Sequence, residues 1–402
     1  MPIALIAPEM LLSSMREHLS YVLLTPYSIA KSRTGGILSR LLSRTDLELV
    51  GAQIFTPHEA FVQEYADSLR KRQPQDELTI LADYVEKNLG PTNGRKHRSL
   101  LLLFRGQTPC KKLMDICGRI PIQKFEVDFN SAETIRETYS DLIFSKEDST
   151  EVSYFEPAVL TPRLQDDANS DLLRFANLLE SEENIVKNMS YPDPSKIEKT
   201  LVILKPDNWK HNSSRPGAIL EMFSRCGLRI VGLKVHRFTL AQALDFYAPV
   251  ETVLKEKLAP TFGFQARELL EREFRFKLSE EAAWHLTGCV GIERAHEEFT
   301  KLIEFMSGRR PNECLAEEVN IPGNVKCMII IYEGENAIRK IRDVLGPTDP
   351  LQAPEGTVRR EFGLSVMVNT AHASDSQEGY EREKNIVNIN ENTLSSFIRA
   401  YV

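Results

Sequence analysis

The 402-residue sequence predicts two α+β domains, each an antiparallel four-stranded sheet with helices on one face in the ferredoxin-like βαββαβ order. In the second half, an apolar strand pattern at 201–207 is followed by a helix and a second strand through 227–233. A later strand at 325–332 precedes a helix at 336–345. The first half opens with the same order of strand, helix and strand, which predicts a duplicated domain.

Sequence self-similarity relates the two halves. Residues 21–27 align with 201–207 at an offset of 180 residues, and residues 36–51 align with 217–232 at an offset of 181. Identical pairs at the second offset include Ser43 with Ser224, Arg44 with Arg225, Leu47 with Leu228, and Val50 with Val231. Two further segment pairs follow in the same order, 100–106 with 328–334 and 134–136 with 357–359. This repetition indicates two copies of one fold.

The repeat divides the chain into a first copy at 1–160, a linker at 161–198 and a second copy at 199–402. Within the linker, apolar residues recur at helical spacing: Leu172, Leu173, Phe175, Leu178 and Leu179. They predict an amphipathic helix capped by Asn169 or Ser170. Such a helix could pack on either copy or across both.

His372 is the strongest candidate for a chemical role. It follows an apolar alternation at 362–368 that predicts a strand, and it precedes a polar stretch at 374–383 that predicts a helix start. A neutral imidazole is nucleophilic near pH 7, since its reference pKa is about 6.5. His372 can therefore accept a phosphoryl group, although a histidine without such context is more often a structural residue.

The surroundings of His372 in the sequence suit a polyphosphate. Thr348 and the turn at 346–350 are flanked by basic residues, namely Arg339, Lys340, Arg342, Arg359 and Arg360. Guanidinium groups bind phosphate oxygens and stabilise a phosphoryl group in transfer. The carboxylate of Glu383 can hold an imidazole in one tautomer. Any single arginine here has the alternative of belonging to a solvated surface.

Together with the Lys-Pro-Asp segment at 205–207, several segments show that the second half resembles a nucleoside diphosphate kinase. These segments are 332–336, 345–350, 356–359 and 369–376. The resemblance implies that a nucleoside triphosphate phosphorylates His372, which then passes the phosphoryl group to a nucleoside diphosphate. It also implies Mg²⁺ as a cofactor that bridges the phosphates, with no metal site made by protein residues alone.

The same resemblance assigns the phosphate and ribose contacts. Lys205 would contact the sugar hydroxyl and the phosphates, and Asn369 would hold the ribose. The phosphates would be bound by Arg342, Thr348 and Arg359.

For the catalytic histidine, the resemblance implies three supporting residues. Glu383 and Ser374 would orient the imidazole of His372, and Tyr247 would lie close to it.

The chain departs from the family pattern at several places. Ala373 stands where a glycine is usual, and two insertions are expected near 251–295 and 309–324. Phe299 and Leu302 would clamp the base, although an aromatic residue at helical spacing more often belongs to the core.

The first copy lacks most of the residues that the chemistry needs. Three replacements are Thr25 for Lys205, Tyr27 for Asp207, and Met114 for Arg342. No histidine occurs between His97 and His211, so the position expected to match His372, near Ser149, cannot be phosphorylated in the same way. Arg136 survives, but this copy is expected neither to bind polyphosphate well nor to transfer it.

Composition limits the partners and the location. A net charge of −7 argues against a general nucleic-acid binder. The 6 cysteines include no CxxC pair and indicate reduced thiols. The N-terminus lacks the features of a signal peptide, and no apolar run is long enough to span a membrane. We therefore expect no membrane partner and a cytoplasmic location.

Two functions are compatible with the sequence. The first is a kinase whose second copy is active and whose first copy is a structural partner or regulator. The second is a nucleotide-binding regulatory or signalling protein with weak or no turnover, in which the insertions block turnover or a phosphohistidine modifies another protein; the insertion at 251–295 distinguishes the two functions. Because family members assemble from dimers, we expect a homo-oligomer in which the two copies of one chain mimic such a dimer.

Overall fold

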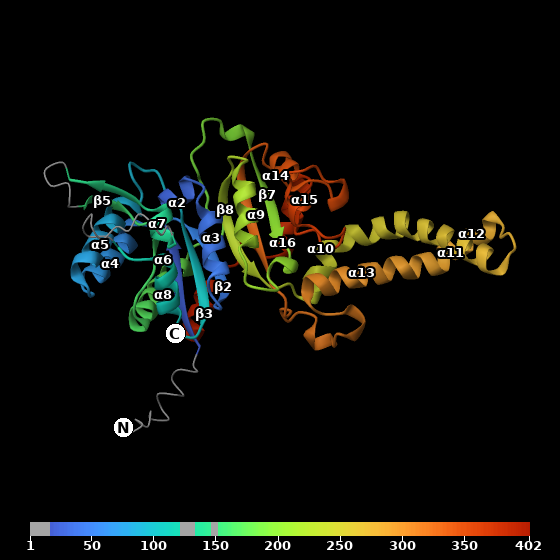
Figure 1. The fold of residues 1–402 in the computed structure, drawn as a ribbon, viewed down its shortest axis with the longest axis horizontal. Helices are drawn as coiled ribbons and strands as arrows, with labels where there is room; N and C mark the ends of the chain where they lie inside the picture. Colours follow the sequence, from blue (N-terminus) through green and yellow to red (C-terminus); the bar gives the residue numbers. More distant parts are fainter. Residues whose placement is uncertain (1–16, 121–132, 146–151) are drawn as a thin grey trace, which may run out of the picture.

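The structure is a computed structural model that describes residues 17–120, 133–145 and 152–402. Figure 1 shows two halves packed side by side, the first in blue and green and the second in yellow to red. A helical arm projects from the second half, away from both sheets. In the part of the chain that the structure describes, no helix has the length and apolarity needed to cross a bilayer.

The first half contains an antiparallel four-stranded sheet with the strand order β2-β3-β1-β6. Its strands and helices are β1 (His18–Leu24), α2 (Pro26–Ala30), α3 (Thr34–Ser43), β2 (Glu48–Phe55), α4 (Glu59–Arg70), α5 (Gln75–Asn88), β3 (Ser99–Gly106), α6 (Pro109–Cys117), α7 (Ile135–Tyr139), β4 (Asp141–Phe144), β5 (Val152–Glu156), β6 (Val159–Leu160) and α8 (Gln165–Glu180). Strands β4 and β5 form a separate hairpin.

The second half contains an antiparallel sheet with the order β10-β7-β9-β8. Its strands and α-helices are β7 (Ile197–Leu204), α9 (Arg215–Ser224), β8 (Arg229–His236), α10 (Leu240–Val253), α11 (Ala259–Phe274), α12 (Glu280–Leu286), α13 (Ile292–Ser307), β9 (Cys327–Glu335), α14 (Ala337–Leu345), α15 (Val358–Phe362), β10 (Ala371–Ala373), α16 (Gln377–Ile386) and α17 (Leu394–Tyr401). Short 3₁₀ turns are η2 (Pro194–Lys196), η3 (Pro206–Asn208), η6 (Pro311–Glu313), η7 (Ala316–Glu318) and η8 (Pro350–Gln352), and π-helical turns are η4 (Leu254–Leu258) and η5 (Thr287–Gly291).

The order of elements confirms the predicted α+β class with two ferredoxin-like domains. In each half a strand, a helix and a strand precede a helical pair, and a strand, a helix and a short strand follow it. The prediction that helices cover only one face is wrong. In β1, Val22 packs toward α3 and α6, whereas Leu23 packs toward α4, α5 and α8. Both faces of β1 are apolar, so both need a helical layer.

Strand register shows which residues of the two copies correspond. Leu24 pairs with Val159, as Leu204 pairs with Ala371. The next residue along the edge strand is therefore Leu160 in the first copy and His372 in the second. The expectation that the position near Ser149 matches His372 is wrong, because the segment before the edge strand differs in length. Ser149 itself lies outside the described residues.

The segment before His372 also differs from its prediction. The predicted strand at 362–368 is absent: α15 ends at Phe362, and the chain stays irregular until β10. Leu364 and Val366 are 79% and 58% exposed, so the apolar alternation there faces solvent and pairs with no strand. The following helix, α16, begins after the cap residue Ser376, later than predicted.

Helix α8 packs on the first copy and also on α17, which belongs to residues 199–402, so of the three predicted arrangements the structure has the one that contacts both. It lies against β1 and α4 and contributes Phe175 to the core there. It begins at Gln165, so the predicted caps are wrong: Asn169 and Ser170 lie inside the helix and bond back to its first turn. The C-terminal helix α17 packs beside α8 and inserts Ile398 into the same core.

The two copies contact each other through equivalent elements. Helices α3 and α9 cross where Gly35 meets Gly217, and strand β2 lies beside β8 (Figure 1). A Cβ at Gly217 would lie 2.4 Å from the carbonyl oxygen of Gly35, so the crossing tolerates no side chain there. At the strands, Glu48 forms an ion pair with Arg237 at 2.9 Å.

The expected insertion at 251–295 forms most of the projecting arm. Helix α10 continues through η4 into α11, and the chain returns through α12, η5 and α13. Small residues face each other inside this hairpin: a Cβ at Gly263 would lie 2.7 Å from the backbone nitrogen of Thr287, and one at Gly291 would lie 2.2 Å from the carbonyl oxygen of Ala259. The arm is thus a closely packed extension of the helical pair.

Candidate active site

His372 is held in one orientation by a carboxylate and a hydroxyl group. Its Nε2 atom lies 2.8 Å from Oε1 of Glu383, whose Oε2 accepts a hydrogen bond of 2.6 Å from the hydroxyl of Ser374. Because a carboxylate only accepts, the proton of the neutral imidazole lies on Nε2. The lone pair of Nδ1 is then available for a bond to phosphorus.

The backbone and two aromatic rings fix this triad. The amide of Leu201 donates to the hydroxyl of Ser374 at 3.3 Å, which ties the triad to the central strand β7. The rings of Phe246 and Tyr247 lie 5.1 Å and 6.3 Å from the imidazole of His372. Burial raises the pKa of Tyr247 well above its usual value, so its hydroxyl stays protonated.

A cavity of about 650 Å³ opens at this site. Five of the predicted site residues line it: His372, Glu383, Arg342, Thr348 and Arg359. They come from β10, α16, α14, the loop after α14, and α15. The fold thus collects residues that are far apart in the sequence around one opening.

Two arginines carry positive charge in the cavity lining. Arg359 donates to the carbonyl oxygens of Gly346 and Ala371 at 2.9 and 3.0 Å, and its buried Nε has no partner among the described residues. Burial and the nearby Arg342 lower the pKa of Arg359 to about 10, which leaves it charged at neutral pH. Within the same described residues, Arg342 forms no side-chain ion pair. Uncompensated guanidinium groups suit a phosphate chain.

Asn369 contacts the lining residue Thr348, and Lys205 contacts Asn369. The ammonium of Lys205 donates to Oδ1 of Asn369 at 2.7 Å, and Nδ2 of Asn369 donates to the carbonyl oxygen of Thr348 at 3.1 Å. Burial, and to a smaller extent the charge of Arg359, lowers the pKa of Lys205 to about 7. Neither Lys205 nor Asn369 belongs to the cavity lining.

The two predicted base contacts lie elsewhere. Phe299 is 4% exposed and belongs to the core, and Leu302 packs partly buried against that core. Neither residue lines the cavity. The helical spacing that suggested a clamp is therefore the spacing of a core-facing side of α13.

Sequence reasoning missed two residues that support the site. Phe246 contacts the imidazole ring, but a phenylalanine in an apolar helix gives no signal of such a role. Arg215 donates to Asp207 at 2.8 Å and to the hydroxyl of Thr370 at 2.9 Å, which joins the Lys-Pro-Asp segment to the chain just before His372. Its position after a long loop obscured this link.

The donors at the site suit a metal ion that arrives with phosphates. In the described ranges, no three histidine, cysteine, aspartate or glutamate side chains are placed to hold a metal ion. Of the carboxylates in the cavity lining, Glu383 is committed to His372, whereas Asp375 and Asp343 stand at the opening. Mg²⁺ prefers a few carboxylates together with phosphate oxygens, so this set fits a nucleotide-borne ion.

The corresponding region of the first copy is filled. Its cavity measures only about 20 Å³, and its lining includes Leu160, Met114 and Ile120, the counterparts of His372, Arg342 and Thr348. Arg72 and Arg163 also line it, but they are paired with Asp171 and Glu77. Thr25, the counterpart of Lys205, donates to the buried carboxylate of Glu156 at 2.8 Å. A space this small, with its arginines already paired, does not suit phosphate.

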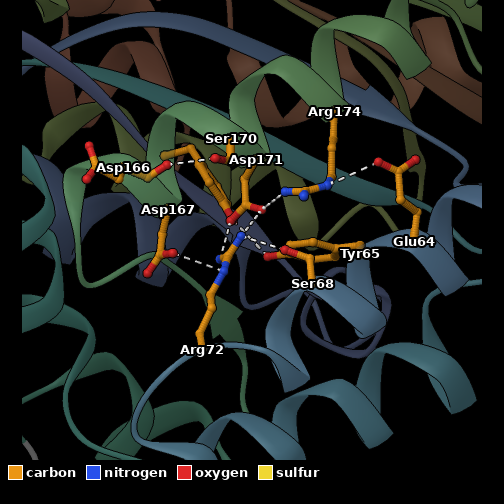
Figure 2. Close-up of polar contacts among 10 residues, drawn as sticks. Glu64, Tyr65, Ser68, Arg72, Asp166, Asp167, Ser170, Asp171 and Arg174 are labelled. Carbon is orange, nitrogen blue, oxygen red and sulfur yellow. Dashed lines mark hydrogen bonds and ion pairs between the residues drawn. The ribbon is translucent and has the colours of Figure 1, made fainter.

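Asp171, which corresponds to Glu383, binds arginines instead of a histidine. Figure 2 shows Arg72 and Arg174 converging on this carboxylate. Arg72 donates to its two oxygens at 2.8 and 2.6 Å, and the hydroxyl of Tyr21 donates at 2.7 Å. Arg72 lies between α4 and α5, so its ion pair with Asp171 joins this helical pair to α8.

A family model and curated relatives indicate one family. A family model described as nucleoside diphosphate kinase matches residues 293–392. A "Nucleoside diphosphate kinase" of Paracoccus denitrificans (strain Pd 1222) is 35% identical over 187 residues, which cover 46% of this chain and 90% of that protein. One of Erythrobacter litoralis (strain HTCC2594) is 31% identical over 187 residues, with coverage of 46% and 90%. A crystal structure of the Aquifex aeolicus nucleoside diphosphate kinase is 26% identical, covers 50% of this chain and 98% of its own, and has a TM-score of 0.31.

Proposed function

Because this chain belongs to the nucleoside diphosphate kinase family of phosphotransferases, we propose that its second copy moves the terminal phosphate of a nucleoside triphosphate to a nucleoside diphosphate through phosphorylated His372. One observation carries this proposal. The Nε2 atom of His372 is occupied by Glu383, while the residue lines a cavity beside two guanidinium groups. A nucleophile and the groups that stabilise its phosphoryl donor are thus in one place.

In the first half-reaction, the lone pair of Nδ1 attacks the terminal phosphorus, and the bond to the bridging oxygen breaks. The nucleoside diphosphate leaves with the electrons of that bond. The imidazole becomes cationic, and the carboxylate of Glu383 at 2.8 Å stabilises that charge. Arg342 and Arg359 stabilise the charge that spreads over the transferring phosphoryl oxygens. The second half-reaction reverses these steps with another diphosphate.

We propose the remaining roles from the family resemblance. Lys205 and Asn369 hold the sugar and phosphate side of the nucleotide, and Thr348 contacts a phosphate. Mg²⁺, when bound to the nucleotide, neutralises part of its charge, and Asp375 and Asp343 are the carboxylates at the opening that can face it. No residue of 251–295 lines this cavity, which supports turnover over the alternative in which this insertion blocks it.

The test is transfer of a labelled phosphate. The protein is mixed with Mg²⁺ and γ-labelled ATP and is then chased with GDP. Acid-labile label on the chain that moves to GDP is expected, and His372→Ala should abolish it while nucleotide binding persists. His285→Ala, on the exposed part of the arm, is the matched control. Label in His372→Ala would show that another residue is the nucleophile.

We also propose that the two copies of one chain take the place of two subunits, and that whole chains then associate further. The equivalent contacts of α3 with α9 and of β2 with β8 support the first part. Sedimentation should show a particle larger than one chain of 45.7 kDa. A single-chain particle at micromolar concentration would limit the assembly to this internal pair.

A further inference from the structure

The helical arm carries a large share of the exposed apolar side chains. Of the 20 large apolar residues that are exposed within the described ranges, 9 lie between 250 and 292: Val250, Val253, Phe264, Leu269, Phe274, Phe276, Trp284, Val290 and Ile292. Figure 1 shows the tip of the arm standing apart from both sheets. Single exposed apolar residues are ordinary on a protein surface, but a group of them marks an interaction surface.

The interior of the arm is built from small residues. The fully buried positions between its helices include Ala259, Ala283 and Ala295. The facing chain already occupies the places where Gly263 and Gly291 would carry a Cβ atom. Hydrophobic stabilisation is proportional to the apolar area removed from water, so such an interior contributes little of it. The large apolar side chains lie on the outside of the hairpin, where only another molecule can bury them.

Phe264 and Trp284 form an aromatic pair on one side of the arm. They directly follow the buried residues Gly263 and Ala283, so the two antiparallel helices point them toward the same side of the hairpin. Their rings meet edge to face with centroids 6.0 Å apart, yet Phe264 is 43% exposed and Trp284 is 60% exposed. A pair that the hairpin already holds in place loses little side-chain freedom when a partner covers it.

We propose that the arms of two chains pack against each other, so that the arm of a second copy covers Phe264 and Trp284. Two helical hairpins that pair in this way form a four-helix bundle, which buries the outer apolar face of each hairpin. A twofold axis relates the two arms, so each contributes the same residues. The proposal rests on the association of whole chains proposed above, for which it names the contact, and it does not depend on phosphoryl transfer.

Charge and area favour a second copy as the partner. Residues 254–296 contain 7 basic and 7 acidic side chains, so the arm has no net charge with its histidines neutral. An anionic lipid surface or a nucleic acid would require a basic face.

The aromatic residues Phe264, Phe274, Phe276 and Trp284 expose roughly 450 Å² per arm, or about 900 Å² in two arms. The aliphatic neighbours and the polar rim bring two arms into the range of a stable interface, about 1,200–2,000 Å².

The first experiment is sedimentation equilibrium of the full chain and of Phe264→Glu/Trp284→Glu. Paired arms would bring the added carboxylates together, so association should weaken at least tenfold. Ile143→Glu/Leu173→Glu adds the same charge at exposed positions of the first copy and should associate like the unaltered chain. Because all four positions are exposed, far-ultraviolet circular dichroism should be unchanged in both variants.

The outcomes separate the arm contact from the association of chains. Equal association of the arm variant and the unaltered chain would overturn the arm contact and leave the association standing. An unaltered chain that stays single at submillimolar concentration would overturn both.

Tryptophan fluorescence tests the contact without altering the arm. The chain has 2 tryptophans, so Trp209→Phe leaves Trp284 as the reporter. Its emission should shift to shorter wavelength as the chain concentration rises through the association range, because the partner arm removes water from the ring. The same shift in Trp209→Phe/His372→Ala would show that it needs no phosphoryl transfer. Emission that stays at long wavelength while sedimentation shows association would overturn the contact at Trp284.

Discussion

The two copies share an arginine with the same structural role, and only one of the two arginines also belongs to the candidate active site. Arg136 donates to the carbonyl oxygens of Gly118 and Val159, and Arg359 donates to those of Gly346 and Ala371, at corresponding positions. Each arginine fastens a turn and the edge strand to the sheet. Only Arg359 also lines an open cavity. Arg136 therefore keeps the structural contacts of Arg359 in a copy that has no histidine at the position of His372.

The carboxylates at the corresponding helix position, Glu383 and Asp171, also have different partners in the two copies. Glu383 accepts from His372 and Ser374, whereas Asp171 is neutralised by Arg72 and Arg174. The cavities measure about 650 and 20 Å³. A site that needs a ligand stays open, and a site that has lost its ligand is filled by an ion pair and apolar side chains. The copies therefore differ in what surrounds the carboxylate, while the backbone is shared.

The sharpest test of this difference is the carboxylate of the second copy. Glu383→Gln should lower kcat on the order of 10³-fold or more, because the amide no longer stabilises the cationic imidazole and permits the wrong tautomer. Steady-state kinetics with ATP and GDP would measure it, and Glu381→Gln on the same helix is the control. A loss below tenfold would mean that Glu383 serves only packing.

In the first copy, the equivalent carboxylate should matter for stability. Arg72→Met leaves buried Asp171 without its main cation and should lower the free energy of unfolding by about 3–5 kcal/mol. Urea denaturation measures the loss. Combining Arg72→Met with Asp171→Leu should recover much of it, because no unpaired charge stays buried. A double variant less stable than Arg72→Met would refute the ion-pair explanation.

Exchanging one pair of corresponding residues tests the phosphate contacts. Arg342→Met copies Met114 into the second copy and should lower kcat/KM by about 10²–10³-fold, through loss of a charged donor to the transferring group. Arg339→Met, an exposed neighbour on α14, is the control. In a His372→Ala background, Met114→Arg should restore nothing, since Leu160 supplies no nucleophile. Any turnover there would show that the first copy retains a site.

The smallest expected effect concerns pH. Burial lowers the pKa of Lys205 to about 7, so raising the pH through 7 removes its charge in the free enzyme. If the charged form binds phosphates, kcat/KM should fall above pH 7 by roughly tenfold per unit at most. Lys205→Met should remove this limb of the profile and lower the plateau. A profile that keeps its fall in Lys205→Met would assign it to another group.

Folding stability should show the opposite trend from the same residue. The pKa of Lys205 is lower in the folded chain than the unfolded reference of about 10.4. The unfolded chain therefore binds more protons between about pH 7 and 10, and stability from this residue rises with pH over that window. Urea titrations at pH 7 and 9 should show a smaller gain in Lys205→Met than in the unaltered chain.

Much of the fold and site followed from the sequence because the signals are local. The duplicated strand-helix-strand order, with the later strand and helix of the second half, predicted two α+β domains. His372, Glu383 and the arginines were predicted because their chemical types are rare in combination. The lining of the cavity by His372, Glu383, Arg342, Thr348 and Arg359 depends on the fold that those local signals specify.

What the sequence by itself determined is which residue types occur in which copy, and therefore which copy can carry a nucleophile. Only the tertiary structure showed that Leu160 occupies the position equivalent to His372. It also showed that 363–370 forms no strand and that Phe299 is buried. It alone also decided the direction of the arm (Figure 1). The physical reason is that strand pairing and burial depend on which segments lie next to each other in the fold. Where the two copies have segments of different length, the sequence alone does not show which residues correspond.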